Sequence, residues 1–157
     1  MIERNRSDVP ARRRLLRGAT ALVLARYLPA HAADKLLPQI PALSAFLATR
    51  TPRWERVSLE LPQLADNGQV VPMRLSVAGP FAPGPFVGAL HLYSEMNPVP
   101  QMAVFEFPVP LERIEVESRV RLAATQHVVA LAEMTDGSIC AAMTEVVVTL
   151  AGCLDGT

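Results

Sequence analysis

The residues IEVESRVRLAATQHVVALAE (114–133) are followed by the turn TDGS (135–138) and then by ICAAMTEVVVTL (139–150). β-Branched residues are frequent in both long segments, and charged residues alternate with apolar ones at the start of the first. Such alternation is typical of a strand with one buried face. An Asp-Gly pair between two segments of this kind favours a hairpin turn. This third of the chain therefore predicts paired antiparallel strands.

The same strand signals extend towards the N-terminus. Four shorter segments are rich in apolar or β-branched residues: Val57–Leu61, Val70–Val77, Phe86–Ser94 and Ala103–Phe107. Asp66-Asn67-Gly68 and a proline-rich stretch at 79–85 separate them as a turn and a loop. Before them, a stripe of apolar residues predicts a short helix from about Pro41 to Ala48. Six or seven short strands at this spacing predict an all-β, immunoglobulin-like β-sandwich.

The first 32 residues carry the zones of an export signal. Arg12-Arg13-Arg14-Leu15-Leu16-Arg17 fits the twin-arginine pattern, and an apolar run follows at 18–28. Ala30 and Ala32 supply the small residues of a cleavage site. We expect residues 1–32 to be removed on export by the twin-arginine route, which places the mature chain in the periplasm. A basic amphipathic helix that stays on the protein is the alternative; a membrane span is excluded because the run is too short and too polar.

Composition limits what the mature chain can bind. The whole chain has 157 residues, of which 50% are hydrophobic, as expected for one globular domain, here 33–150. The first 32 residues hold seven of the 15 basic and two of the 15 acidic side chains. Without them the net charge is 8 − 13 = −5. Because nucleic-acid binders are basic on the binding face, no nucleic-acid partner is expected.

The chain has two cysteines, Cys140 and Cys153. They are 13 positions apart on or just after one extended strand, which separates them by roughly 40 Å. A disulfide needs α-carbons within about 7 Å, so two free thiols are predicted. Cys140, inside the strand, is expected to be buried. Cys153 belongs to a tail, 151–157, with Gly152 and Gly156; it is a functional thiol, an incidental cysteine or a dimer-forming one.

No motif for a metal or cofactor is evident. A blue-copper site needs two histidines, a cysteine and an axial methionine. The mature chain offers His91 and His127, but no His or Met follows Cys153. The pattern therefore argues against a periplasmic copper or redox protein, which stays only as an alternative, and we expect no metal and no cofactor.

Five short segments, taken in order, resemble one protein family. They are LADNGQVVP (64–72), NPVPQMAVF (97–105), RVRLA (119–123), DG (136–137) and VVVT (146–149) leading to Gly152-Cys153. Together with the twin-arginine signal, they are similar to the SoxY family, the sulfur carriers of the bacterial thiosulfate-oxidising (Sox) system. The resemblance covers nearly the whole chain.

The resemblance implies a fold, a partner and a role. SoxY-like proteins are immunoglobulin-like sandwiches that pair with a second β-sandwich subunit, SoxZ. Their cysteine lies on a flexible Gly-Gly-Cys-Gly-Gly terminus, which makes Cys153 the expected site of covalent attachment. A c-type cytochrome couples thiosulfate to the cysteine, a hydrolase releases sulfate, and a sulfane dehydrogenase oxidises the remaining sulfur. A carrier of this kind is not itself an enzyme.

The tail departs from the family pattern. It reads AGCLDGT (151–157), so Leu154 stands where a glycine is expected and Asp155 adds a negative charge. The alternative that follows is a non-catalytic SoxY-like interaction subunit with a degenerate tail.

Overall fold

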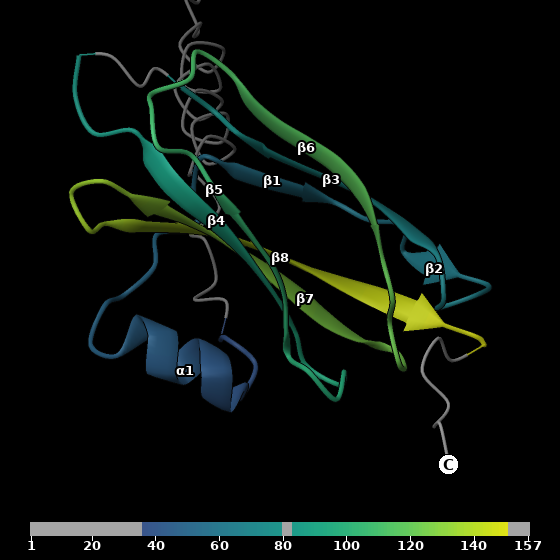
Figure 1. Ribbon diagram of the computed structural model, residues 1–157. Helices are drawn as coiled ribbons and strands as arrows, with labels where there is room; N and C mark the ends of the chain where they lie inside the picture. Colours follow the sequence, from purple (N-terminus) through teal and green to yellow (C-terminus); the bar gives the residue numbers. More distant parts are fainter. Residues whose placement is uncertain (1–35, 80–82, 151–157) are drawn as a thin grey trace, which may run out of the picture. The chain divides into compact units, whose positions relative to one another are not determined.

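The computed structural model describes residues 36–79 and 83–150 (Figure 1). The chain divides into two units, Met1–Leu36 and Leu37–Thr157, and the fold described below is that of the second. The predicted signal segment (1–32) and tail (151–157) lie outside the described residues, so both stay predictions. Among the described residues, no helix is long and apolar enough to cross a membrane.

Within the described residues, eight strands form two sheets that face each other. The strands are β1 (Val57–Glu60), β2 (Leu64–Ala65), β3 (Val71–Val77), β4 (Val87–Ser94), β5 (Gln101–Glu106), β6 (Ile114–Val120), β7 (Gln126–Met134) and β8 (Ile139–Val148). The smaller sheet has the order β1-β3-β6, and the larger has the order β2-β8-β7-β4-β5. Neighbouring strands are antiparallel except for the short parallel pair β2–β8. The predicted immunoglobulin-like sandwich is confirmed.

The space between the sheets is filled by alternate residues of the strands. In β3, Val71, Met73, Leu75 and Val77 are buried, while the residues between them are exposed or half-buried. Successive side chains of a strand point to opposite faces, so this alternation buries one face of the smaller sheet. Full burial of a side chain such as Leu75, which has 0% exposure, contributes about 1.5–3 kcal/mol to folding.

Helix α1 (Pro41–Leu47) covers the opposite face of the larger sheet (Figure 1). Its Leu43 and Leu47 pack with Tyr93 of β4 and with Val129 and Leu131 of β7. Proline near the first helical position suits a helix start because its missing N–H would have no partner there. As a result β7 is buried on both faces. Its apolar run is continuous rather than alternating.

The sequence left open whether 114–133 is one strand or two. It is two strands, because β6 belongs to the smaller sheet and β7 to the larger, and residues 121–125 cross between them. Strand β2 was not predicted, which brings the number of strands to eight rather than six or seven. The helix, predicted to about Ala48, ends at Leu47.

A β-bulge interrupts the pairing of β4 with β5. Leu92 lies opposite Ala103, whereas its neighbour Tyr93 lies opposite Gln101, so β5 has one extra residue, Met102. β5 is the edge strand of the larger sheet.

The predicted hairpin turn at 135–138 joins β7 to β8. The N–H of Gly137 donates to the carbonyl of Met134 at 2.9 Å, and the N–H and hydroxyl of Ser138 donate to the Asp136 carboxylate at 3.0 and 2.7 Å. Gly137 has φ +83°, a conformation that glycine adopts without strain. The turn is therefore confirmed, together with the reason for its glycine.

Candidate functional site

The predicted attachment residue, Cys153, and the predicted tail glycines, Gly152 and Gly156, lie outside the described residues. The structure does describe the point from which that segment leaves the sandwich. β8 ends at Val148, and Thr149 and Leu150 follow it. These two residues are called the tail root below.

The tail root is held by three hydrogen bonds to residues 65–68, the end of β2 and the loop after it. The N–H of Thr149 donates to the carbonyl of Ala65 at 3.1 Å, and its hydroxyl donates to the carbonyl of Asp66 at 2.9 Å. The N–H of Gly68 donates to the carbonyl of Leu150 at 2.7 Å. Backbone groups after the last residue of a strand would otherwise bond only to water. The chain is thus fixed up to Leu150.

The short strand β2 accounts for this attachment. Leu64 lies opposite Val147 and Ala65 opposite Val148, in parallel orientation. The N–H of Val147 also donates to the carbonyl of Gln63 at 2.9 Å. Two residues are too few for a stable strand by themselves. Here they extend the larger sheet beside the last residues of β8.

Gly68 connects the tail root to the segment that crosses between the sheets. Its carbonyl accepts a hydrogen bond of 2.8 Å from the N–H of Leu122, while its own N–H binds Leu150. The side chain of Asn67 accepts the N–H of Gln69 at 2.8 Å, which is the local bond expected of an Asx turn. The turn predicted at Asp66-Asn67-Gly68 is therefore confirmed, and it lies beside the tail root.

Asn97 ties the loop between β4 and β5 to the same crossing segment. Its Nδ2 donates to the carbonyl of Arg121 at 2.8 Å, and its Oδ1 accepts the N–H of Ala123 at 2.9 Å and Nε2 of Gln126 at 3.1 Å. Gln126 is 3% exposed, and its Oε1 accepts the N–H of Met96 at 2.8 Å. A buried amide needs such partners, because an unpaired one costs about 1–3 kcal/mol.

Four of the sequence segments singled out above meet at this end of the sandwich. The residues 64–68, 95–101, 121–126 and the tail root are joined by the hydrogen bonds just described, and Thr125 Oγ1 adds one more by accepting the N–H of Val148 at 3.0 Å. They are called the tail end below. Figure 1 shows these loops near the arrowhead of β8. The sequence singled out Asn97 and Gly68 only as members of the NPVP and DNG motifs. Their role in joining these loops by hydrogen bonds was not predicted, and the two motifs were the only indication of it in the sequence.

Cys140 is buried between the two sheets. Its exposure is 0%, and it belongs to the core cluster between the sheets. It is a free thiol. The prediction of a buried, structural Cys140 is confirmed. A residue packed in this way behaves as a small apolar side chain rather than as a reactive group.

Neither histidine of the described part of the chain belongs to a metal site. His127 lies on the surface with Nδ1 2.9 Å from Oε2 of Glu95, and this hydrogen bond is the main reason that the pKa of Glu95 is lowered. His91 is 8% exposed, and its ring lies 4.2 Å from the ring of Phe46. Within residues 36–79 and 83–150, no three His, Cys, Asp or Glu side chains gather in a way that could hold a metal ion.

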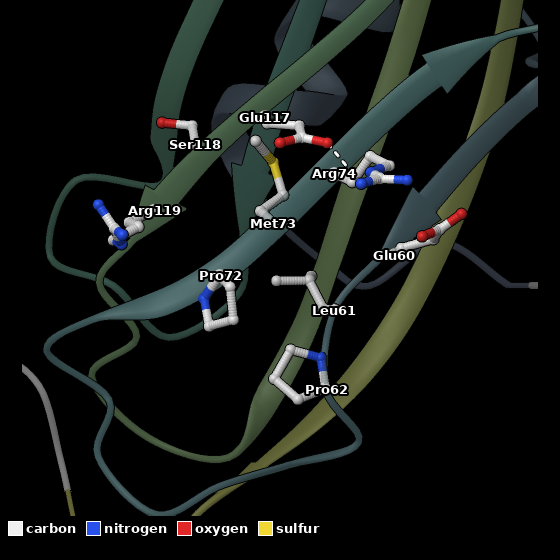
Figure 2. A pocket seen from close by; sticks show the side chains of 9 residues that line it. All are labelled: Glu60, Leu61, Pro62, Pro72, Met73, Arg74, Glu117, Ser118 and Arg119. Atoms are coloured by element: carbon white, nitrogen blue, oxygen red, sulfur yellow. Dashed lines mark ion pairs between the residues drawn. The ribbon is translucent and has the colours of Figure 1, made fainter.

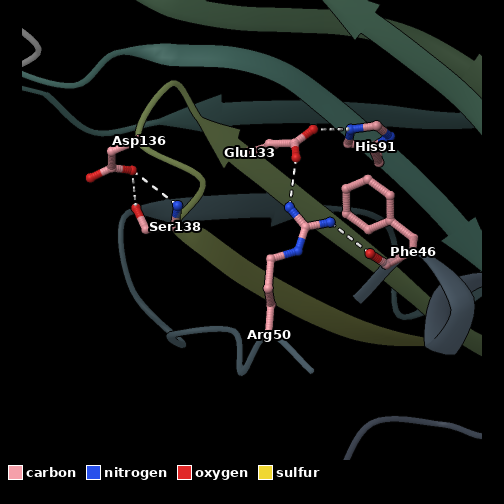
Figure 3. Close-up of polar contacts among 6 residues, drawn as sticks. All are labelled: Phe46, Arg50, His91, Glu133, Asp136 and Ser138. Carbon is pink, nitrogen blue, oxygen red and sulfur yellow. Dashed lines mark hydrogen bonds and ion pairs between the residues drawn. The ribbon is translucent and has the colours of Figure 1, made fainter. Parts of the chain in front are cut away.

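A polar cluster lies between the helix region and the larger sheet (Figure 3). Nη1 of Arg50 is 2.7 Å from Oε1 of Glu133, and its Nη2 donates to the carbonyl of Phe46 at 2.6 Å. His91 Nε2 is 3.4 Å from Oε2 of Glu133, which is close enough for an ion pair but not aligned as a hydrogen bond. Arg50 is the largest cause of the lowered pKa of Glu133. The cluster fastens the helix to β7, away from the tail end.

Open grooves border the smaller sheet, and two of them are lined by Ser118 and Arg119 of β6. One, of about 1040 Å³, lies on its outer face, where Arg74 is paired with Glu117 at 2.5 Å and Arg119 points away from that pair (Figure 2). The other, of about 450 Å³, lies between the edge strands β5 and β6. Its lining is mainly apolar and reaches Asn97 and Arg121 of the tail end.

Comparison with known proteins identifies the family. A family model described as sulfur oxidation protein SoxY matches residues 43–153. The structure of the sulfur carrier protein SoxY from Chlorobium limicola f thiosulfatophilum is similar, with a TM-score of 0.57 and 25% sequence identity, covering 69% of this chain and 94% of that one. The superoxide reductase (neelaredoxin) from Ignicoccus hospitalis gives a TM-score of 0.47 at 16% identity, covering 60% of this chain and 80% of that one. That weaker likeness says nothing about chemistry.

No curated protein sequence matches the chain. The SoxY match nevertheless spans well over half of the residues and runs from within α1 to Cys153. The chain therefore belongs to the SoxY family.

Proposed function

We propose that this protein is a periplasmic carrier of the Sox system that binds thiosulfate-derived intermediates covalently on Cys153 and presents them to partner enzymes. The observation that carries the proposal is the fixed tail root. Hydrogen bonds hold the chain up to Leu150, and the attachment cysteine follows three residues later. The family match, which ends at Cys153, supports the same residue.

A carrier must offer its cargo at a limited distance from a body that partner enzymes can recognise. Three residues span at most about 11 Å, so the α-carbon of Cys153 cannot be further than that from Leu150. The buried thiol of Cys140 could not serve, because a partner enzyme cannot reach a side chain with 0% exposure. The two cysteines are therefore assigned different roles.

The chemistry is supplied by the partners, and the chain itself is not an enzyme. The thiolate of Cys153 and thiosulfate lose two electrons to a c-type cytochrome and form a new S–S bond, giving a cysteine S-thiosulfonate. A hydrolase then adds water, releases sulfate with two protons, and leaves a persulfide anion on the cysteine. A sulfane dehydrogenase oxidises that remaining sulfur. Cys153 must be a thiolate when it reacts, and no group on the described surface has to act as acid or base.

A SoxZ-like β-sandwich subunit is the proposed stable partner, as in the rest of the family. Export by the twin-arginine route fits such a pair, because this route carries proteins that have already folded and assembled. The signal segment 1–32 would then be absent from the mature protein. N-terminal sequencing of the periplasmic form, with a start near Ala33 or Asp34 expected, tests this part of the proposal.

A second candidate function rests on Leu154 and Asp155. Both replace the small, uncharged residues that allow the family tail to enter narrow active sites. If they block entry, the protein is an interaction subunit that keeps the fold and the partner but carries no sulfur.

Intact-mass spectrometry separates the two functions. The protein is purified from the periplasm of cells grown on thiosulfate and measured with and without reductant. We expect an adduct of thiosulfonate or persulfide mass that reductant removes and that maps to the peptide containing Cys153. The Cys140→Ala variant should keep the adduct, and Cys153→Ser should lose it. A bare thiol in the wild-type protein would contradict the carrier function and leave the interaction subunit.

A further inference from the structure

β6 forms one edge of the smaller sheet, and no strand of the described residues is hydrogen-bonded to its outer side. Its residues Ile114–Val120 pair with β3 without a register shift, whereas the pairing of the other edge strand beside the groove, β5, is interrupted by the bulge. A straight edge offers a row of N–H and C=O groups to a further strand. β6 is therefore a regular edge to which another strand can be added.

The backbone groups that point to this open edge follow from the pairing of β3. In an antiparallel sheet, successive residues of a strand bond alternately to the neighbour on one side and to the neighbour on the other. The N–H of Ala78 donates to the carbonyl of Arg56, just before β1, so the odd-numbered residues of β3 bond to β6. Their partners are the even-numbered residues of β6. The N–H and C=O groups of Glu115, Glu117 and Arg119 consequently point away from the sheet, to the open edge.

The charges along β6 are self-complementary. The segment EVESRVR (115–121) has two glutamates and two arginines at alternate positions, on either side of Ser118. Both glutamates are paired with Arg74 of β3, and Arg119 points away from that arginine (Figure 2). Within the described ranges, neither arginine of the segment has a carboxylate within ion-pair distance. An antiparallel copy of the same segment would place an acidic residue opposite each of these arginines.

We propose that two copies of this chain pair through their β6 edges, antiparallel and with Ser118 opposite Ser118. In this register Arg119 lies opposite Glu117 of the second copy, and Arg121 lies opposite Glu115. The same two contacts recur on the other side of the two-fold axis, because such an interface uses the same surface of both copies. Side chains directly opposite each other on neighbouring strands are close enough to form ion pairs. The two smaller sheets, of three strands each, become one continuous sheet.

The backbone fits the same register. Glu117 and Arg119, whose N–H and C=O groups point to the open edge, lie opposite each other, and each such pair exchanges two hydrogen bonds. Ser118 then forms a pair without hydrogen bonds on the two-fold axis, where side chains approach most closely. Val120, which lines the groove of about 450 Å³, lies opposite Val116 of the second copy. The second copy thus also adds apolar surface beside the groove.

The pairing goes beyond the carrier function and does not depend on it, but it determines how two tails are arranged. β6 ends at Val120, and Gly68 connects Leu122, two residues later, to Leu150 of the tail root. The two β6 strands run in opposite directions. The two tail roots therefore lie at opposite ends of the joined sheet, where two partner enzymes could engage them at the same time.

Sedimentation velocity of the mature chain alone, in reductant and over a range of concentrations, tests the pairing. We expect an equilibrium between monomer and dimer. Arg119→Glu combined with Arg121→Glu, called the acidic variant, should raise the dissociation constant of the dimer about 100-fold, because attraction becomes repulsion at each contact. Arg53→Glu is the control. Arg53 bridges to β8, far from β5 in the strand order, so its reversal should leave the dissociation constant unchanged.

A second variant tests whether the charges recognise each other. Glu115→Arg combined with Glu117→Arg, called the basic variant, should also be monomeric, because four arginines then face four arginines. An equimolar mixture of the acidic and basic variants should restore the dimer, since every contact again joins a glutamate to an arginine. Urea denaturation of each variant alone checks that it is folded. If the basic variant does not fold, the acidic variant and the cross-link below still decide the question.

The register is tested by a cross-link. Ser118→Cys, introduced together with Cys153→Ser, should form a disulfide between two copies under mild oxidation, because residues opposite each other on the axis bring their α-carbons within disulfide range. Electrophoresis without reductant detects the linked dimer. Glu117→Cys in the same background is the control: it lies opposite Arg119 of the second copy and should remain unlinked.

A chain that stays monomeric throughout the concentration range would overturn the proposal. So would a dimer that the acidic variant leaves unchanged, or a cross-link through Glu117→Cys in place of Ser118→Cys. If the chain alone is monomeric and the acidic variant instead weakens binding of a purified SoxZ-like subunit, the edge belongs to that partner and the proposal is wrong. None of these measurements needs a sulfur cargo, so their failure is distinct from the absence of an adduct in cells.

Discussion

The two ends of the sandwich are held together in different ways. At the end with the turn 135–138, the hairpin end, the side chain of Asp136 binds Ser138, two residues away. At the tail end, Asn97 binds Arg121 across 24 positions, and Thr149 binds Asp66 across 83. The hairpin turn is thus closed by adjacent residues, with added bonds from Phe86 to Thr135 and from Arg53 to Ser138. The hydrogen bonds that hold the tail root, by contrast, all come from distant parts of the chain. Local bonds are enough to form a structural turn, whereas the tail root, from which the proposed carrier tail extends, depends on bonds to distant residues.

We expect the largest loss of stability at the tail end from Asn97→Ala. The substitution removes three hydrogen bonds and leaves buried Gln126 without one of its partners. We expect a loss of about 2–3 kcal/mol in the free energy of unfolding, measured by urea denaturation. Asn67→Ala is the control, since the Asn67 side chain makes one exposed, local bond; it should cost less than about 1 kcal/mol. Equal losses in the two variants would contradict the difference between long-range and local support.

The hairpin end is tested by Gly137→Ala. Gly137 has φ +83° and nothing within 4 Å of an added Cβ, so the cost is backbone strain alone. We expect a loss of about 1 kcal/mol in the same denaturation experiment. Gly88→Ala is the control: its φ is not in the left-handed region, and an added Cβ would meet neighbours at 3.7 Å, an ordinary contact. A loss in Gly88→Ala as large as that in Gly137→Ala would argue against the strain.

The smallest effect concerns one of the long-range contacts near the hairpin end, the Arg50–Glu133 pair. Arg50 lowers the pKa of Glu133 in the folded protein. The stabilisation is therefore complete above the unfolded pKa of about 4.3 and is lost as the pH falls through the folded value. Because the pair is partly exposed, with side-chain exposures of 34% and 32%, Glu133→Gln should cost no more than about 1 kcal/mol at neutral pH.

Urea denaturation between neutral pH and pH 3 provides the measurement. The gap between wild type and Glu133→Gln should close as the pH falls, because protonated Glu133 resembles glutamine. If the difference in the free energy of unfolding stays constant with pH, then packing of the Glu133 side chain, rather than its charge, stabilises the contact between the helix region and β7.

The sequence predicted those features that depend on neighbouring residues. The strand at β3, the Asp136-Gly137 turn and the burial of Cys140 follow from patterns a few residues long. β7 does not alternate because α1 covers its second face, so the sequence pattern did not show where β6 ends and β7 begins, and the predicted number of strands stayed at six or seven. Strand β2 was missed because two residues carry no pattern; it is a strand only because β8 lies beside it.

The candidate site was predicted only in part, for the same reason. Cys153 was chosen from its position and from the family resemblance, and it lies outside the described residues. The arrangement that holds the tail root uses Gly68, Leu122 and Asn97, which belong to three separate segments of the chain. No pattern of neighbouring residues predicts that they meet. The family resemblance includes these residues in its motifs, but only the folded structure shows the hydrogen bonds between them.

The extra residue in β5 has a consequence for the behaviour of the protein in concentrated solution. An edge strand offers unpaired N–H and C=O groups to any other strand, including the same edge of a second molecule. Met102 shifts the register between Leu92 and Tyr93, and a bulge of this kind bends and twists the strand that carries it. A second copy would find only the four residues from Ala103 to Glu106 in regular register, fewer than the six or seven that are typical of strand segments in fibrils. The bulge thus disfavours pairing of two molecules along the β5 edge.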